Sequence, residues 1–457
     1  MTHFSAMDLA AWAQGRWTTL PQAAVSGFGT DTRTLRRGDV FVAVRTERRD
    51  GHDFLSDARN KGASCALVSR PMADALPQLV VDDVLTGLRR IAQAWRQCFK
   101  GQVIAVTGSV GKTSTKELLA ALLGAEAFVT EANLNNLIGV PLMLLRVEPG
   151  RHRFAVIEAG MSVPGELAVS AQVIRPDLAI VTAVAPVHLE GVGSVAGVAR
   201  EKATLLAALT PSGRAILPVA LLRWEEFAVH AHRCTAVQFE GEPAPAVTPA
   251  RLIQAKYRED EKGHRTLVLD GKSFGLGALS DGLVRNAALA VVAARDLGLS
   301  DNQIAQALST WTPPAGRGSV HVLGSQTFYL DCYNSSPASL FDAVTCFDRL
   351  SSKQSGPRLF ILGGMAELGI HAAEFHRESG AKLPLRAGDK VVAFGGEAPA
   401  YLQGISRTDV TLLAVDTLDE VAQVLNSHAG YVFVKGSRSH ALERCLPHSL
   451  RAALSFH

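Results

Sequence analysis

The chain lacks closely spaced cysteines and long apolar segments. Its six cysteines, among 457 residues, are scattered without a CxxC pair, which fits reduced thiols used for packing and offers no zinc-site spacing. The longest apolar run, residues 178–189, is interrupted by Thr182, Pro186 and His188 and is shorter than the roughly 20 residues that cross a bilayer. We therefore expect no membrane span.

The chain also lacks a large excess of positive or negative charge. The 46 basic and 43 acidic residues leave a net charge of +3, which is too balanced to indicate nucleic acid as a partner but suits anionic small molecules locally. The first residues, MTHFSAMDLA, do not have the basic and then apolar segments of an export signal, so a cytoplasmic protein is expected. With 47% hydrophobic residues the composition is that of a globular enzyme.

Short apolar runs that alternate with helical stretches predict three α/β domains. Residues 1–98 form a small module, and residues 99–314 repeat a strand–turn–helix rhythm that is typical of a parallel sheet covered on both faces. More polar, hairpin-like sequence at 218–277 interrupts this rhythm as an elaboration of the central domain. After the linker PPAGRG, residues 315–457 predict a Rossmann-like third domain with a mostly parallel sheet.

The segment TGSVGKT at residues 107–113 is the most specific signal in the chain. It follows an apolar strand and precedes a helix-forming run, so that its backbone N–H groups can face a phosphate chain, with Lys112 as a point charge and Thr113 available to Mg²⁺. It departs from the GxxxxGK[ST] pattern because Val106 stands five residues before Gly111. The predicted nucleotide-binding residues are Gly108, Ser109, Val110, Gly111, Lys112, Thr113 and Ser114.

Two further polar residues follow strands of the same predicted sheet. Glu158 closes the strand after the glycine loop, and His188 lies just beyond the next strand. Ligands of open parallel sheets bind beyond the carboxyl ends of the strands, so Thr113, Glu158 and His188 are expected to share one crevice. Oxygen ligands favour Glu158 over His188 as a Mg²⁺ ligand, and purely structural roles remain an alternative for both.

Lys202 lies in the apolar stripe of a predicted helix. Ser194 can cap this helix, and Lys202 falls on the same face as Val195, Val198 and Leu209. A lysine at such a position must extend to solvent, pair with a carboxylate or lose its positive charge, because burial of a bare ammonium is costly.

Several distinctive motifs are dispersed along the whole chain. The central domain has TGSVGKTSTKE, TEANLNNLIGVPLMLL and IEAGMSVPGEL, and the first module has DTR, GDVFVA and DGHDF. The third domain has DCYNSSP, GGMAELG and VKGSRSHALE. Together these motifs resemble the Mur ligase family, ATP-dependent amide-forming enzymes of peptidoglycan synthesis. The motifs of the first module resemble that family's uridine-diphosphate-sugar binding domain, and those of the third domain resemble its blocks Y-N-A-N-P, G-D-M-x-E-L-G and K-G-S-R.

The resemblance implies roles for particular residues. Lys112, Glu158, His188 and Lys202 would be catalytic, with one Mg²⁺ held by Thr113 and Glu158, a second by His188, and Lys202 carbamylated as a further metal ligand. Asn286, Arg317 and Asp331 would contact the adenine, phosphate and ribose of ATP, which requires the third domain to close onto the second. The substrate-binding residues implied are Asp31, Thr32, Arg33, Asp50, Gly51, His52, Asn135, Asn136, Tyr333 and Asn334.

The activity implied is the joining of D-alanyl-D-alanine to UDP-N-acetylmuramoyl-tripeptide through an acyl phosphate, by a monomer that uses ATP and Mg²⁺. The chain departs from the family in three motifs. The block G-x-H-N-x-x-N keeps only its last residue, Asn286, with Gly282 in place of the His, while Ser336 replaces an Asn and Gly364 an Asp. Another amide ligase of the superfamily is an alternative, although the DNP of diaminopimelate-adding members is absent. A non-catalytic nucleotide-binding homologue and a nucleotide switch or small-molecule kinase are the other hypotheses.

Overall fold

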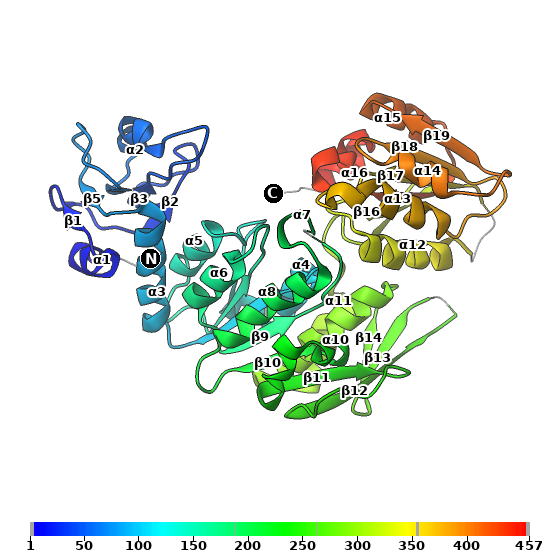
Figure 1. Ribbon diagram of the computed structural model, residues 1–457, viewed down its shortest axis with the longest axis horizontal. Coiled ribbons are helices and arrows are strands. Elements are labelled where there is room, and N and C mark those ends of the chain that lie inside the picture. Colours follow the sequence, from blue (N-terminus) through cyan, green and yellow to red (C-terminus); the bar gives the residue numbers. More distant parts are fainter. Residues whose placement is uncertain (1–3, 188, 262, 353–355, 454–457) are drawn as a thin grey trace.

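The strands of the molecule form three separate sheets, each with its own helices (Figure 1). A computed structural model describes residues 4–187, 189–261, 263–352 and 356–453. Within these residues the sheets have five, nine and six strands in chain order. The prediction of three α/β domains is therefore confirmed. None of the described helices has the length and apolarity needed to cross a membrane.

The first sheet has the strand order β1-β5-β4-β3-β2, and only the pairing of β1 with β5 is antiparallel. The short apolar runs of the sequence at 41–44, 65–68 and 79–81 correspond to β3, β4 and β5, whereas β1 and β2 are too short to show a hydrophobic period. The elements are α1 (Ala6–Ala13), β1 (Arg16–Trp17), β2 (Gly27–Gly29), β3 (Asp39–Val42), α2 (Leu55–Asn60), β4 (Cys65–Val68), β5 (Gln78–Val80) and α3 (Val84–Cys98).

Helix α3 attaches the first domain to the central one. Asp83 caps its start by accepting a hydrogen bond from Thr86 N. Near its end, Trp95 Nε1 donates to Val147 O at 3.1 Å, and Arg96 donates to Asp177 Oδ2 at 2.8 Å. Apolar residues of α3 also share one core with residues of the central domain, so the first domain rests on a packed and hydrogen-bonded helix.

The central sheet has the order β14-β13-β12-β11-β10-β9-β6-β8-β7, and its neighbours are parallel from β7 as far as β12. The strands are β6 (Gln102–Thr107), β7 (Ala127–Val129), β8 (Phe154–Glu158), β9 (Leu178–Val181), β10 (Arg214–Pro218), β11 (Cys234–Phe239), β12 (Arg251–Glu259), β13 (Arg265–Leu269) and β14 (Lys272–Leu276). The helices are α4 (Lys112–Leu123), α5 (Gly139–Leu145), α6 (Glu166–Ile174), α7 (Leu189–Val192), α8 (Val195–Ala207), α9 (Glu225–Ala228), α10 (Asp281–Asp296) and α11 (Asp301–Thr310).

The segment 218–277 differs in part from its expected hairpin character. β12, β13 and β14 form the antiparallel meander that the sequence predicted. β11, however, pairs in parallel with both β10 and β12, so this segment extends the main sheet. Only short helical turns connect β10 to β11, and they carry no helical period by which a crossover could be recognised.

The third sheet has the order β15-β16-β20-β17-β18-β19 and is parallel except for the edge strand β15. Its expected mostly parallel character is confirmed. The elements are β15 (Ser319–Leu323), β16 (Gln326–Asp331), α12 (Pro337–Ser352), β17 (Arg358–Gly363), α13 (Ala372–Ala381), β18 (Lys390–Phe394), α14 (Pro399–Gly404), β19 (Thr411–Val415), α15 (Leu418–Asn426), β20 (Gly430–Lys435) and α16 (His448–Ala453).

Candidate active site

The glycine loop forms the turn between β6 and α4. Gly111 precedes the helix with φ of 84°, a left-handed conformation that favours glycine. A Cβ at this position would lie 2.5 Å from Asn286 Oδ1 of α10, so the close packing of α10 on the loop also requires glycine. The free N–H groups at the start of α4 thereby face the space beyond β6.

Lys112, the first residue of α4, folds back over the loop. Its Nζ donates a hydrogen bond to Gly108 O at 2.7 Å. Burial lowers the pKa of Lys112, while Glu158 opposes this shift and Arg317 of the third domain adds to it. The lysine therefore lies where charges from two domains meet, as expected of a group that binds a phosphate chain.

Glu158 is buried at the end of β8, with only 2% of its surface exposed. Its Oε1 accepts hydrogen bonds from Thr113 Oγ1 at 3.2 Å and from Asn135 Nδ2 at 2.8 Å. Its Oε2 has no hydrogen-bond partner among the described residues, and the nearest cation, Lys116 Nζ, is 3.9 Å away. A buried carboxylate oxygen without a hydrogen bond is costly unless a cation binds it.

Thr113 and Glu158 fit a magnesium ion, because Mg²⁺ prefers oxygen ligands and is commonly held by one or two carboxylates together with water and substrate phosphates. The part of the chain that the structure describes contains no cluster of three or more histidine, cysteine, aspartate or glutamate side chains that could hold a metal by itself. His188, the expected ligand of a second ion, lies outside the described residues.

Lys202 of α8 is buried in the protein, with 1% of its surface exposed. The interpretation that its side chain extends to solvent is therefore wrong. Burial lowers the pKa of Lys202 well below that of an exposed lysine, Lys112 lowers it further, and Glu201 opposes both. The folded protein thus favours the neutral amine. The expected Ser194 cap of α8 is confirmed, since Ser194 Oγ accepts from Gly197 N.

The third domain supplies the opposite wall of the site. The guanidinium of Arg317 lies 3.9 Å from the ring centre of Tyr333. Lys435, at the end of β20, donates to Asp331 Oδ2 at 2.5 Å and to Asn334 O at 3.1 Å. Burial raises the pKa of Asp331, and Lys435 opposes this rise.

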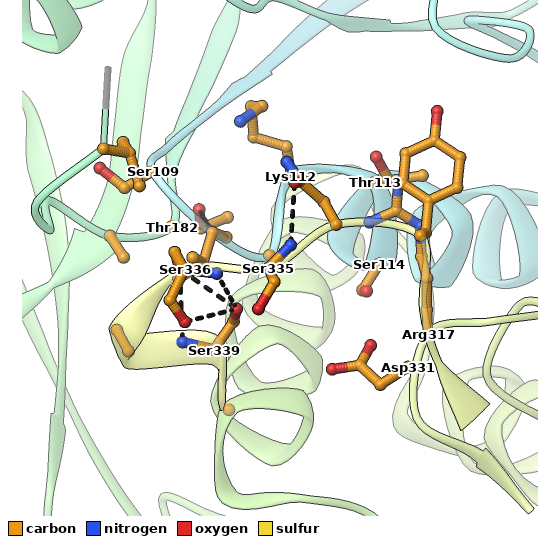
Figure 2. Close-up of a pocket in the computed structure, with 18 of the residues that line it drawn as sticks. Ser109, Lys112, Thr113, Ser114, Thr182, Arg317, Asp331, Ser335, Ser336 and Ser339 are labelled. Atoms are coloured by element: carbon orange, nitrogen blue, oxygen red, sulfur yellow. Dashed lines mark hydrogen bonds between the residues drawn. The ribbon is translucent and has the colours of Figure 1, made fainter. Parts of the chain in front are cut away.

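A cavity of about 900 Å³ lies between these two walls. Figure 2 shows Lys112, Thr113 and Ser114 of α4 facing Ser335, Ser336 and Ser339, with Arg317 and Asp331 beside them. Lys202 does not line this cavity. The predicted site residues that do are Ser109, Val110, Gly111, Lys112, Thr113, Ser114, Asn135, Asn136, Glu158, Asn286, Arg317, Asp331, Tyr333 and Asn334.

The predicted residues of the first domain lie elsewhere and do not line the cavity. Asp31 forms a local, exposed ion pair with Arg33. His52 is buried, and its Nδ1 lies 2.6 Å from Asp50 Oδ1 while its Nε2 accepts from Ser69 N at 3.0 Å. Both ring nitrogens of His52 therefore have partners inside the domain. Substrate binding by the first domain stays a prediction for six residues: Asp31, Thr32, Arg33, Asp50, Gly51 and His52.

The departures from the motifs have local structural roles. Ser336 lies just before α12, where its Oγ accepts from Ser339 N at 3.4 Å and bonds Ser339 Oγ at 3.1 Å. Gly282 N donates to Asp342 Oδ1 of α12 at 2.8 Å, which joins the central and third domains. A Cβ at Gly282 would lie 2.6 Å from Asp342 Oδ2, so a larger residue there would displace this carboxylate.

Sequence reasoning missed Lys435 as a site residue. Its position at the end of an apolar strand, directly before GSR, was the available signal. Its pairing with Asp331 joins residues 104 positions apart, which no local pattern reveals.

The three α/β domains and a glycine loop that faces the third domain across a large cavity define a nucleotide-dependent enzyme of several domains. Residues 24–95 match the model described as Mur ligase family, catalytic domain, and residues 106–294 match the Mur ligase middle domain. An Escherichia coli (strain K12) protein named UDP-N-acetylmuramoyl-tripeptide--D-alanyl-D-alanine ligase is 32% identical over 427 residues, 91% of each chain. The chain belongs to the Mur ligase family.

Solved structures agree with this assignment. A crystal structure of MurF from Acinetobacter baumannii has 28% sequence identity and a TM-score of 0.84, and the match covers 99% of both chains. The MurF ligase from Thermotoga maritima in complex with ADP has 26% identity and a TM-score of 0.78, covering 94% of this chain and 98% of that one.

Proposed function

We propose that the protein is an ATP-dependent ligase that joins D-alanyl-D-alanine to UDP-N-acetylmuramoyl-tripeptide in the synthesis of peptidoglycan precursors, as a monomer in the cytoplasm. One observation carries the proposal: the glycine loop, Glu158 and the third-domain residues line the same cavity. Glu158 Oε2, one of its two carboxylate oxygens, has no hydrogen-bond partner among the described residues. Relatives named for this reaction match the chain over nearly its full length, which supports the same substrates here.

The reaction needs activation because a carboxylate is a poor electrophile at neutral pH. The terminal carboxylate of the tripeptide attacks the γ-phosphate of ATP, giving an acyl phosphate and ADP. The amine of D-alanyl-D-alanine, after loss of a proton, attacks the acyl carbon, and the tetrahedral intermediate releases phosphate. No protein nucleophile is required, so the chain contributes position and charge.

Individual residues divide this work. Lys112 exchanges its bond to Gly108 O for the transferred phosphate, and the N–H groups of Val110 and Gly111 hold the phosphate chain. Thr113 and Glu158 would hold Mg²⁺, which neutralises phosphate charge. His188 would hold a second ion, and a carbamylated Lys202 would be a further metal ligand. Asn286 binds the adenine, Arg317 a phosphate and Asp331 the ribose.

Each of the three domains has its own substrate. Residues 1–98 bind the uridine-diphosphate sugar through Asp31, Thr32, Arg33, Asp50, Gly51 and His52. Residues 99–314 bind ATP and present the tripeptide end to Asn135 and Asn136. Residues 315–457 deliver the amine, next to Tyr333 and Asn334, and close onto the nucleotide.

The test is a product analysis. The protein is incubated with ATP, Mg²⁺, the tripeptide nucleotide and D-alanyl-D-alanine, and mass spectrometry identifies the product while phosphate release is followed. A pentapeptide nucleotide supports the proposal. Turnover only of the dipeptide nucleotide with meso-diaminopimelate or L-lysine would assign the chain to an earlier step, and absence of all turnover would indicate a non-catalytic homologue. The molar mass of the protein, measured by light scattering after size-exclusion chromatography, tests whether it is a monomer.

A further inference from the structure

The imidazole of His440 lies in a slot formed by glycines at the strand ends of the third domain. His440 ends the short 3₁₀ helix η6 (Arg438–His440), which follows β20. A Cβ on Gly364, just after β17, would lie 2.9 Å from His440 Nε2, and one on Gly395, just after β18, would lie 2.6 Å from Nδ1. A side chain at either glycine is thus incompatible with the ring in this place.

The ring is held on its other sides as well. Phe394 meets it edge-on with ring centres 5.9 Å apart. Burial lowers the pKa of His440, and a hydrogen bond with the backbone of Gly364 opposes that shift. The imidazole is therefore a packed group that is bonded to the backbone of the first residue of the loop that follows β17.

Two cavity-lining loops meet at this ring. Residues 366–368 and 437–439 both line the active-site cavity, whereas His440 itself does not. Ser437 connects the loops, because its N–H donates to Gly364 O at 3.1 Å and its Oγ accepts from Ala366 N at 2.9 Å. His440 N in turn donates to Ser437 O at 3.0 Å. Ser437 thus ties the two loops together, while the ring of His440 packs against Gly364 at the start of one loop and directly follows the other loop in the chain.

We propose that His440 is a positioning residue for the amine substrate, holding the loops 364–368 and 437–439 in the arrangement that receives the dipeptide. This inference rests on the proposed function. Position 364 carries Asp in the motif that the chain resembles, and here the imidazole occupies the space that a side chain at 364 would need. The ring lies against Gly364, Gly395 and Phe394 and against none of the residues assigned to ATP, so its loss is expected to affect the amine more than ATP.

The test uses His440→Ala, Gly364→Ala and the double variant. Gly364 is not among the residues with positive φ, so alanine is unfavourable there only through its contacts. Each single variant is expected to raise KM for D-alanyl-D-alanine by about threefold to tenfold, the effect of one lost hydrogen bond. KM for ATP stays within about twofold on the same scale. The double variant should be no worse than the worse single one, because loss of the ring removes the 2.9 Å contact of the methyl group at 364 and leaves only the looser contact with Gly395 O at 3.1 Å.

Matched controls separate positioning from general destabilisation. His428 is a buried histidine at the opposite end of the same sheet, where its Nε2 lies 3.2 Å from Tyr431 O. Gly356 has only the Tyr431 ring near its Cβ position, at 3.8 Å. His428→Ala and Gly356→Ala should leave KM for the amine unchanged. His440→Gln, which keeps a hydrogen-bonding group, should lie closer to wild type than His440→Ala.

The outcomes also separate this inference from the proposed function. Wild-type protein that does not use D-alanyl-D-alanine contradicts both. If the wild-type protein turns over D-alanyl-D-alanine, three results would overturn only the role of His440. These are effects on KM that multiply in the double variant, equal changes in KM for ATP, and no change of KM in the single variants.

Discussion

At the scale of single residues, Lys112 gives the most direct prediction. Lys112→Ala removes the positive charge that the transferred phosphate meets without removing core volume, so ligation should fall by about 10²-fold or more. The melting temperature should stay near that of wild type. Lys272→Ala, which changes an exposed lysine of β14 in the same domain, is the control for general effects of charge. Ligation at the wild-type rate in Lys112→Ala would contradict the assignment of the glycine loop.

Lys202 gives a prediction about chemical modification. Its burial favours the neutral amine, the form that reacts with CO₂, and the resulting carbamate would provide oxygen ligands for a metal. Lys202→Ala should lose most activity and regain part of it when acetate or another short carboxylate is added. The measurement is phosphate release against acetate concentration, with chloride at equal ionic strength as the control.

Two results would contradict carbamylation of Lys202. One is an intact mass, measured without acid treatment, that shows an unmodified lysine in active protein. The other is full activity of Lys202→Ala without added carboxylate.

Residues were predictable from sequence where one local pattern carries the information. The ends of β6 and β8 predicted that Thr113 and Glu158 lie together, whereas the apolar stripe of α8 left open whether Lys202 extends to solvent, and the structure shows it buried. Lys435 and His440 were not assigned roles, because their partners Asp331 and Gly364 lie far away in the sequence and only the folded third domain brings each pair together. His52 shows the reverse case, since its motif did not reveal that the ring is internally bonded.

At the scale of elements, the turn from β6 to α4 can be tested at Gly111. Gly111→Ala combines an unfavourable φ of 84° with a Cβ 2.5 Å from Asn286, so either the loop or α10 must move. ATP affinity should fall by about tenfold or more, measured by calorimetry. The matched control is Gly124→Ala at the end of α4, which has φ of 63° but nothing within 4 Å of its Cβ position. It should cost about 1 to 3 kcal/mol of stability and leave ATP affinity unchanged.

Equal loss of ATP affinity in both variants would mean that backbone strain alone, and not contact with Asn286, explains the glycine at 111. Unchanged affinity in Gly111→Ala would mean that the loop does not hold the nucleotide.

The elements themselves were predictable in proportion to their length and regularity. Buried parallel strands such as β8 and β17 appear in the sequence as continuous apolar runs. The short β1, β2 and β7 do not, and β15 was missed because it alternates exposed and less exposed residues at the sheet edge. The parallel strand β11 was hidden because its connection to β10 contains no regular helix of useful length.

At the scale of the whole molecule, the sequence indicated three domains but not how they face one another. Their arrangement depends on contacts between distant residues, such as Arg96 with Asp177 and Gly282 with Asp342. The result is that the central and third domains share one cavity, while the first domain is attached through α3 (Figure 1).

The shared cavity predicts that nucleotide and substrate bring the central and third domains closer together. Lys112 and Arg317 line it from different domains, and both are cations that a phosphate chain can bridge. Small-angle X-ray scattering should therefore show a smaller radius of gyration when a non-hydrolysable ATP analogue, Mg²⁺ and the tripeptide nucleotide are added. Arg317→Ala removes one end of the bridge and should weaken binding of the analogue by about tenfold. When the same fraction of protein has bound the analogue, Arg317→Ala should also show a smaller decrease in radius of gyration than wild type. Lys272→Ala should behave as wild type. An unchanged radius in saturated wild-type protein would mean that the structure already has the closed arrangement.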